Sequence, residues 1–106
     1  MSERLAQRSP EDLAEEAAAK ALVPELARVL RAAGARRVVL FGSLAYGLFR
    51  CSSDIDLAVA GLTEGALARL ERELTLLAGR PVELANLDSA PPPLRESIDR
   101  FGIEIG

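Results

Sequence analysis

The chain has 106 residues, of which 49% are hydrophobic and 27% charged, and its formal net charge is −3. This length predicts one domain with its own core, and the acidic balance argues against direct nucleic-acid binding, which needs a basic surface. Because there is no histidine and only one cysteine, the usual zinc sites, histidine-based acid–base catalysis and an intramolecular disulfide are excluded.

The N-terminal part of the chain predicts helices. Ser9, Pro10 and Asp12 form a typical helix start, with serine as the N-cap, proline in the first turn and an acid three residues after the cap. Pro24 should disturb this helix, because its ring clashes with the carbonyl four residues earlier. We therefore expect a helix over residues 10–21 and a kink or restart just before Pro24. The second part should carry an apolar face and end at a glycine: Leu26, Val29, Leu30 and Ala33, then Gly34.

Apolar runs further along the chain predict strands. Residues 37–41 are continuously apolar after the first arginine and rich in valine, which is typical of a buried strand. Residues 54–60 alternate small or acidic side chains with larger apolar ones, the pattern of a strand with two different faces. Residues 81–87 predict a third strand and residues 103–105 a terminal one.

Helices are expected between these strands. Residues 43–48 should form a short helical turn, and Thr63 should cap a helix that ends at Gly79. Prolines 91–93 should open a short helix that ends near Gly102, although a polyproline ligand is the alternative interpretation. The core face of the helix after Thr63 should consist of Leu67, Leu70, Leu74 and Leu77.

These elements predict one α/β (α+β) domain over residues 1–106, in which a small mixed β-sheet is packed by helices. Residues 1–36 would form an N-terminal helical segment, and residues 37–106 the core with the chemical motifs. The expected order is α-α-β-α-β-α-β-α-β. No stretch approaches the roughly 20 apolar residues of a membrane span, and the N-terminus lacks a signal-peptide core, so we expect a cytoplasmic protein.

Two short motifs ten residues apart point to a nucleotide site. Gly42 and Ser43 end an apolar run, where a glycine and a small hydroxyl allow backbone N–H groups to approach a phosphate. Asp54 and Asp56 lie two apart on a predicted strand, so both side chains point to the same face. Paired carboxylates suit Mg²⁺, which completes its shell with water and phosphate. Gly47 should support the tight turn after Ser43.

Each motif has a simpler interpretation. Asp54 and Asp56 could be edge-strand carboxylates that face water. Aspartate is disfavoured in strands, however, so a pair of aspartates within an apolar run favours a functional role. Gly42 and Ser43 could form an ordinary turn. Glu83 is a single acid among apolar residues. If its strand pairs beside residues 54–60, a third carboxylate would complete a site for two metal ions.

The two motifs at this spacing resemble the signature of the DNA polymerase β-like nucleotidyltransferase superfamily, and more narrowly its minimal nucleotidyltransferase (MNT) subfamily. The resemblance covers residues 37–106. Beyond the motifs it rests on an acidic residue between apolar ones, a proline-led helix and a closing glycine and strand, in residues 82–87, 90–91, 94–95 and 101–105.

The resemblance implies a nucleotidyltransferase fold and a site with two Mg²⁺ ions and ATP as the donor. Asp54, Asp56 and Glu83 would be the catalytic and metal-binding residues, and Gly42 and Ser43, with Gly47, would hold the phosphates. Two positions depart from the family pattern: Glu83 stands where aspartate is usual, and Tyr46 where arginine is frequent. Arg50 could supply the missing cation. Cys51, in the same loop, should be a small buried or semi-exposed side chain and not a reactive thiol.

The resemblance also implies a partner. Larger relatives carry extra domains to hold the acceptor, and this chain is expected to have none, so a macromolecule with its own hydroxyl fits better. MNT proteins are often paired with HEPN-domain toxins, so the chain would be an antitoxin that transfers a nucleoside monophosphate, AMP by preference, to a HEPN toxin. The alternative is a weak or inactive domain that neutralises its partner by direct binding.

Overall fold

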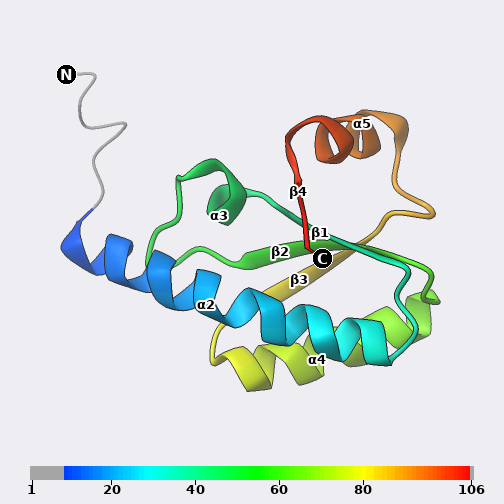
Figure 1. Ribbon diagram of the computed structural model, residues 1–106, viewed down its shortest axis with the longest axis horizontal. Coiled ribbons are helices and arrows are strands. Elements are labelled where there is room, and N and C mark those ends of the chain that lie inside the picture. Colours follow the sequence, from blue (N-terminus) through cyan, green and yellow to red (C-terminus); the bar gives the residue numbers. More distant parts are fainter. Residues whose placement is uncertain (1–8, 106) are drawn as a thin grey trace.

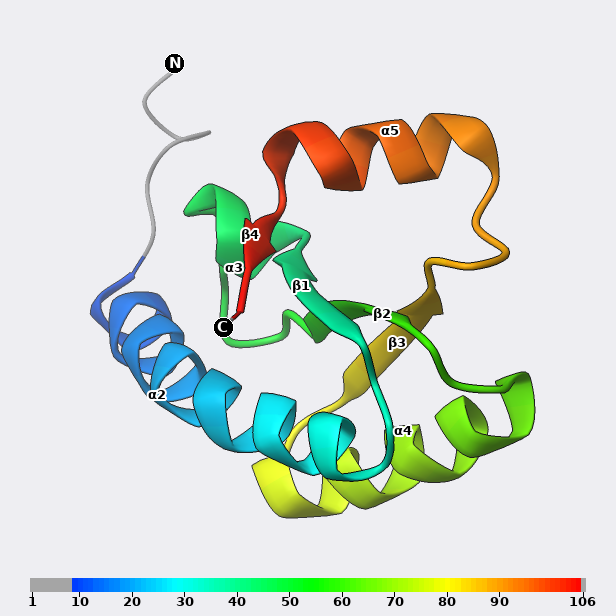
Figure 2. The ribbon, with the colours of Figure 1, turned by 45° about the vertical axis from the view of Figure 1, so that its right-hand side comes forward.

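The computed structural model describes residues 9–105, which form a four-stranded mixed sheet with helices on both faces (Figure 1). Two long helices, α2 and α4, cover one face, and α5 packs on the other, as the turned view in Figure 2 shows. The predicted α/β architecture is confirmed. The elements in chain order are α2 (Pro10–Ala32), β1 (Arg37–Phe41), α3 (Ser43–Tyr46), β2 (Ile55–Ala60), α4 (Glu64–Ala78), β3 (Val82–Asn86), α5 (Pro92–Phe101) and β4 (Ile103–Glu104).

The sheet order is β3-β2-β1-β4. β1 pairs antiparallel with β2 and with β4, whereas β2 and β3 run parallel. The C-terminal end of β1 therefore lies beside the N-terminal ends of β2 and β3. This places the loop after β1, the start of β2 and the start of β3 at one edge of the sheet.

The side chains of each strand alternate between two cores, as a period of two requires. The larger core joins one face of the sheet to α2 and α4, through residues such as Leu40, Leu57 and Leu74. The smaller core lies under α5, where Val39 and Ala58 meet Ile98. The acidic residues of β2 and β3 belong to this second, less covered face.

Helix α2 runs without interruption through Pro24, so the predicted restart is wrong and one helix replaces the two that were expected. Proline inside a helix costs about 3 kcal/mol. Leu26 and Leu30, in the turns after the proline, are both 0% exposed, and burying a leucine contributes roughly 1.5–3 kcal/mol. Packing against the sheet therefore outweighs the lost backbone hydrogen bond.

The predicted caps are confirmed. Ser9 and Asp12 form a reciprocal capping box at the start of α2, Thr63 accepts the N–H of Ala66, and Gly79 ends α4 in the left-handed conformation. Leu67, Leu70 and Leu74 are buried, but Leu77 is 50% exposed and the prediction for it is wrong. At its last turn the inward face of α4 runs through Leu74 and Ala78, and Leu77 lies to one side of it.

Helix α4 also covers the outer edge of β3. The outward N–H of Val82 donates to Thr75 Oγ1 at 3.1 Å, and that of Leu84 donates to Glu71 Oε2 at 2.8 Å. These backbone donors are therefore satisfied within the molecule and are not open to another strand.

The remaining differences from prediction are small. α3, β2, β3 and β4 are each one or two residues shorter than expected, at positions where element ends are poorly defined by pattern. None of the helices in residues 9–105 combines the length and apolar character that a membrane crossing requires.

Candidate active site

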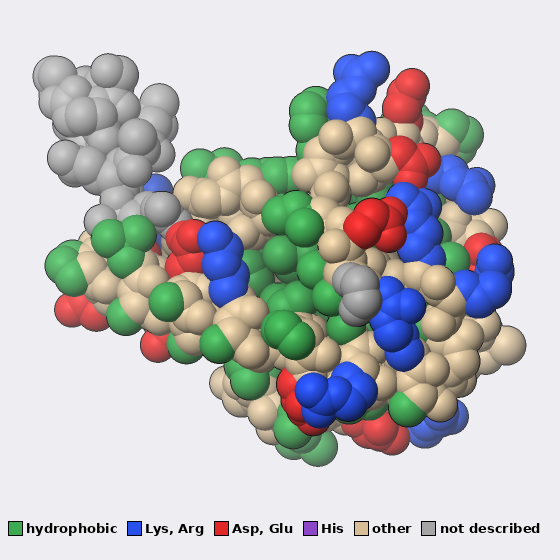
Figure 3. All heavy atoms as spheres, in the orientation of Figure 1, with side chains coloured by type: hydrophobic (Ala, Val, Ile, Leu, Met, Phe, Trp, Pro, Cys, Tyr) green, Lys and Arg blue, Asp and Glu red, His purple; other side chains and the backbone are tan. Residues whose placement is uncertain are grey.

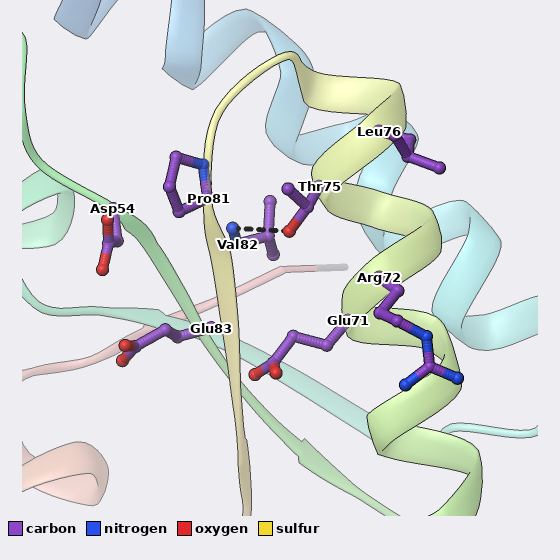
Figure 4. A pocket seen from close by; sticks show the side chains of 8 residues that line it. All are labelled: Asp54, Glu71, Arg72, Thr75, Leu76, Pro81, Val82 and Glu83. Atoms are coloured by element: carbon purple, nitrogen blue, oxygen red, sulfur yellow. Dashed lines mark hydrogen bonds between the residues drawn. The ribbon is translucent and has the colours of Figure 1, made fainter.

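The three acidic side chains singled out in the sequence come together at one edge of the sheet. Asp56 on β2 pairs directly with Glu83 on β3 and also with Phe41 on β1. Asp54 comes two residues before Asp56, just ahead of β2. Figure 4 shows the carboxylates of Asp54 and Glu83 on the same side of β3. The backbone register thus brings Asp56 and Glu83 to the face that carries α5, and Asp54 lies on the same side of β3 as Glu83.

Asp56 is the central member of this acidic cluster. The pKa of its carboxyl is raised from 3.8 to about 6, first by burial and then by the charges of Glu83 and Asp54 and a hydrogen bond with Glu83. Burial and these neighbouring charges therefore disfavour the ionised form of Asp56. A cation bound here would relieve this repulsion.

The backbone at Gly42, directly after β1, lies against the side chain of Asp56. Its φ of 78° and ψ of −160° lie in a region that is nearly restricted to glycine. A Cβ at this position would overlap Oδ2 of Asp56 and would come within 3.0 Å of Cγ and 3.1 Å of Cβ of that residue. The absence of a side chain at Gly42 therefore permits the close approach between the loop and the carboxylate.

The short helix α3 follows at once, with Ser43 as its first residue. Ala45 and Tyr46 donate their N–H groups to the Gly42 carbonyl at 3.0 and 3.1 Å. Gly47 ends the turn in the left-handed conformation, at φ 77° and ψ 23°. Ser43 is half-buried, and its hydroxyl lies in the segment that contacts the acidic cluster through Gly42.

The acidic cluster alone does not provide a complete set of ligands for a metal ion. Within residues 9–105, no group of three or more Asp, Glu, Cys or His side chains is arranged to hold a metal ion. The donor set is nevertheless all oxygen and negatively charged. It fits a hydrated Mg²⁺, which needs only one or two carboxylates when phosphate supplies the remaining ligands.

Two residues that pattern reasoning missed hold the loop before Asp54. Asp12 in α2 is buried, and its second carboxylate oxygen accepts the N–H of Cys51 at 2.8 Å. The N–H groups of Ser9 and Cys51 lower the pKa of Asp12 to about 2, since both stabilise the ionised form. The capping motif indicated Asp12, but nothing in the sequence pattern indicated its contact 39 positions away.

Arg80, just before β3, is the second of these residues. Its guanidinium donates to the Ser53 carbonyl at 3.2 Å and to the Cys51 carbonyl at 3.5 Å, and pairs with Glu15 of α2. It also lies over the Phe49 ring, 4.9 Å from the ring centroid. One side chain thus ties the loop that carries Asp54 to both α2 and the start of β3.

The loop after β1 also contains Tyr46, which departs from the family pattern, and Arg50 and Cys51, which were considered beside it. Tyr46 is 44% exposed, and its ring packs edge-on against Phe101 of α5, with 6.5 Å between centroids. Arg50 lies in the loop after α3, where its N–H donates to Ser53 Oγ. Cys51 is exposed, against the expectation of at least partial burial, because the loop is anchored through its backbone. A hydrogen bond with Asp12, together with the negative charge of that carboxylate, raises the pKa of the thiol, which disfavours the reactive thiolate.

Comparison with known proteins identifies relatives of this chain. The sequence model of the family "Polymerase beta, Nucleotidyltransferase" matches residues 25–105. A solved structure described as a minimal nucleotidyltransferase shares 33% sequence identity, with 85% of this chain and 95% of that chain covered and a TM-score of 0.75. No curated protein matches the chain.

Other similar structures come from toxin–antitoxin complexes. A chain of such a complex with AMP-PNP is 26% identical, with 76% of this chain and 70% of that chain covered and a TM-score of 0.69. A complex of a tri-AMPylated Shewanella oneidensis HEPN toxin with an MNT antitoxin contains a chain that is 27% identical, with 66% of this chain and 55% of that chain covered and a TM-score of 0.54.

Proposed function

This chain belongs to the polymerase β-type nucleotidyltransferase family, and from that premise we propose that it transfers AMP from ATP to a hydroxyl group of a partner protein in a Mg²⁺-dependent reaction. In this reaction the acceptor oxygen attacks the α-phosphorus of ATP and forms a new P–O bond. The bond from that phosphorus to the bridging oxygen breaks, and pyrophosphate leaves with the electron pair. The acceptor hydroxyl becomes a phosphodiester, and its proton passes to Glu83.

The proposal gives each residue of the site a role. Gly42 and Ser43 hold the triphosphate through backbone N–H groups and the serine hydroxyl, and Gly47 shapes the turn behind them. Asp54, Asp56 and Glu83 would hold two Mg²⁺ ions, which when bound neutralise phosphate charge and activate the attacking oxygen. Positioning and charge neutralisation would supply nearly all of the rate enhancement.

A single observation carries this proposal: the register across β1, β2 and β3. It sets Phe41, the residue before Gly42, beside Asp56, and Asp56 beside Glu83. A phosphate-binding turn and three carboxylates would otherwise be separate features of the sequence. Together they form one site with a phosphate-holding side at β1 and an acidic side at β2 and β3.

The acceptor we propose is a hydroxyl, by preference a tyrosine, on a HEPN-domain toxin, which makes the chain an antitoxin. The similarity to chains from MNT–HEPN complexes, one of which contains an AMPylated toxin, supports this partner. The net charge of −3 also suits a basic, RNA-cleaving partner better than RNA itself. Added AMP brings bulk and negative charge, which would oppose RNA binding by the toxin.

Intact mass spectrometry of the toxin tests the proposal. After incubation with this chain, Mg²⁺ and ATP, the mass of the candidate HEPN partner should rise by one or more AMP units. The Asp54→Asn/Asp56→Asn variant and a reaction with EDTA should give no increase. Full neutralisation of the toxin without a mass change, retained in the double variant, would instead identify a binding module that acts by contact alone.

A further inference from the structure

The loop that carries Asp54 is held from outside the acidic cluster, by the first turns of α2 and by Arg80. Asp12 of α2 accepts the N–H of Cys51 at 2.8 Å. Glu15, on the next turn of α2, pairs with the Arg80 guanidinium, which also donates to loop carbonyls. We propose that these three side chains, Asp12, Glu15 and Arg80, form a brace that positions the loop for metal binding. The inference rests on the proposed function and adds residues outside the site that control it.

The contact of the brace that bears most directly on Asp54 is the one to the Ser53 carbonyl. Arg80 donates to this oxygen at 3.2 Å, and the carbonyl belongs to the peptide group that leads into Asp54. Because that group is planar, a bond that holds its oxygen also limits the direction in which the Asp54 side chain leaves the backbone. On the other side of Asp54, the N–H of Ile55 donates to the Pro81 carbonyl at 3.0 Å. The backbone is therefore held both before and after the carboxylate.

The Arg80 side chain is itself fixed in place. It is only 14% exposed, and its guanidinium lies over the ring of Phe49, 4.9 Å from the centroid. Phe49 is the one buried residue among residues 48–52. The arginine thus joins the apolar anchor of the loop, two loop carbonyls and Glu15 of α2. A side chain with so many partners has already lost its rotamer freedom in the folded protein, so it can hold the loop in one position.

Repulsion within the acidic cluster is the reason why such a brace matters. Asp54 lies on the same side of β3 as Glu83, and Asp56 pairs with Glu83, so three like charges are gathered before a cation binds. Asp54 can turn away most easily, because it precedes β2 whereas the other two acids lie within strands. Holding Asp54 in place prepares the metal ligands in advance, so that the ion does not have to order the loop.

Two residues of the brace come from a part of the chain that the family model does not include. The model matches residues 25–105, whereas Asp12 and Glu15 lie in the first turns of α2. Both oxygens of the buried Asp12 carboxylate accept backbone N–H groups, one from Ser9 at the helix cap and one from Cys51 in the loop. The start of α2 and the loop of the site thus share one carboxylate, so this half of the helix acts on the site and not only on the core.

Binding of Mn²⁺ alone, as a probe for Mg²⁺, tests the brace without a transfer reaction. In the wild-type chain, Mn²⁺ should broaden the amide NMR signals of Asp54, Asp56 and Glu83. Glu15→Ala should lower the Mn²⁺ affinity roughly tenfold, the lower end of what is lost when a group that orients a metal ligand is removed. Glu15→Gln should lose less, because its amide oxygen can still accept from Arg80.

Glu11→Ala is the matched control. Glu11 lies one turn before Glu15 on α2, is exposed and carries the same charge, so its removal changes the electrostatic field but not the brace. The Mn²⁺ affinity of this variant should stay within about twofold of the wild type.

Three results would overturn the inference. They are equal losses of affinity in Glu11→Ala and Glu15→Ala, equal losses in Glu15→Gln and Glu15→Ala, and a lower melting temperature of Glu15→Ala with unchanged Mn²⁺ affinity, which would mean that the contacts serve the fold alone. A wild-type chain that binds no Mn²⁺ at the acidic cluster would refute the metal site of the proposed function and this inference with it, so the two failures are distinguishable.

Discussion

Replacing Gly42 by alanine should destabilise the protein more than the same change at Gly47. Both glycines have positive φ, but a Cβ at Gly42 would overlap the Asp56 carboxylate, whereas nothing lies within 4 Å of a Cβ at Gly47. The backbone of Gly42 costs a non-glycine residue about 1–3 kcal/mol, and turning Asp56 aside adds roughly 0.5–1.5 kcal/mol. The left-handed conformation of Gly47 costs alanine only about 1–2 kcal/mol.

Thermal and urea denaturation, followed by circular dichroism, would measure this difference. Gly42→Ala should melt roughly 5–10 °C below Gly47→Ala, since each kcal/mol moves the melting temperature of a domain of this size by about 4–8 °C. Adding Asp56→Ala to Gly42→Ala should recover the steric part, so the double variant should lose about 0.5–1.5 kcal/mol less than the sum of the single changes. Equal melting temperatures for the two glycine variants, or strict additivity with Asp56→Ala, would refute this account of the contact.

Three further predictions concern charges around the site. In EDTA at pH 7, Asp56→Asn should raise the free energy of unfolding by about 1 kcal/mol. Burial and the charges of Glu83 and Asp54 raise the pKa of this carboxyl to about 6, so its ionised form destabilises the fold at pH 7, although solvent screens part of the effect because the side chain is only half-buried. Because this pKa is raised in the folded state, ionisation of Asp56 should lower the stability of the wild type as the pH rises from 3.8 to about 6. Melting curves above pH 6 in which Asp56→Asn is no more stable than the wild type would contradict this expectation. The pKa of Asp12 is lowered in the folded state, so its stabilising effect is present above pH 3.8 and is lost as the pH falls through about 2. Urea denaturation should therefore show that Asp12→Asn is less stable than the wild type at pH 7 but similar in stability near pH 2. In Arg80→Lys, the lysine cannot bind two loop carbonyls and Glu15 at the same time. Amide hydrogen exchange should therefore accelerate at residues 50–54 and stay unchanged in β1. Acceleration of exchange throughout the protein would argue against a local role of Arg80.

The parts of the fold that depend on local pattern could be predicted from sequence. The caps at Ser9 and Thr63 and the stop at Gly79 follow from side-chain and backbone chemistry within one turn of helix. The register that joins Asp56 to Glu83 also has a local cause, because side-chain alternation selects the face of each strand. The sequence alone does not show that the strands of Asp56 and Glu83 pair with each other, and the structure shows that they do.

The parts that depend on packing could not be predicted. Pro24 is tolerated because the residues after it are buried, and no helix propensity includes that energy. Leu77 has helical spacing but no neighbouring layer to cover it. The contacts of Asp12 with Cys51 and of Arg80 with Glu15 join residues 39 and 65 positions apart, and a single sequence carries no signal for such pairs.

The closure of β3 by α4 limits how copies of this molecule could associate through their sheets. β4 is the other edge strand, and beside it lies a hollow of about 470 Å³ lined by residues that include Pro24, Ala27 and Ile105. Figure 3 shows hydrophobic side chains gathered in the middle of this face. A sheet with two open edges can propagate into a fibre, whereas a sheet with one can only pair with itself and stop. Because α4 already satisfies the outward N–H groups of Val82 and Leu84, strand addition between copies cannot continue through β3.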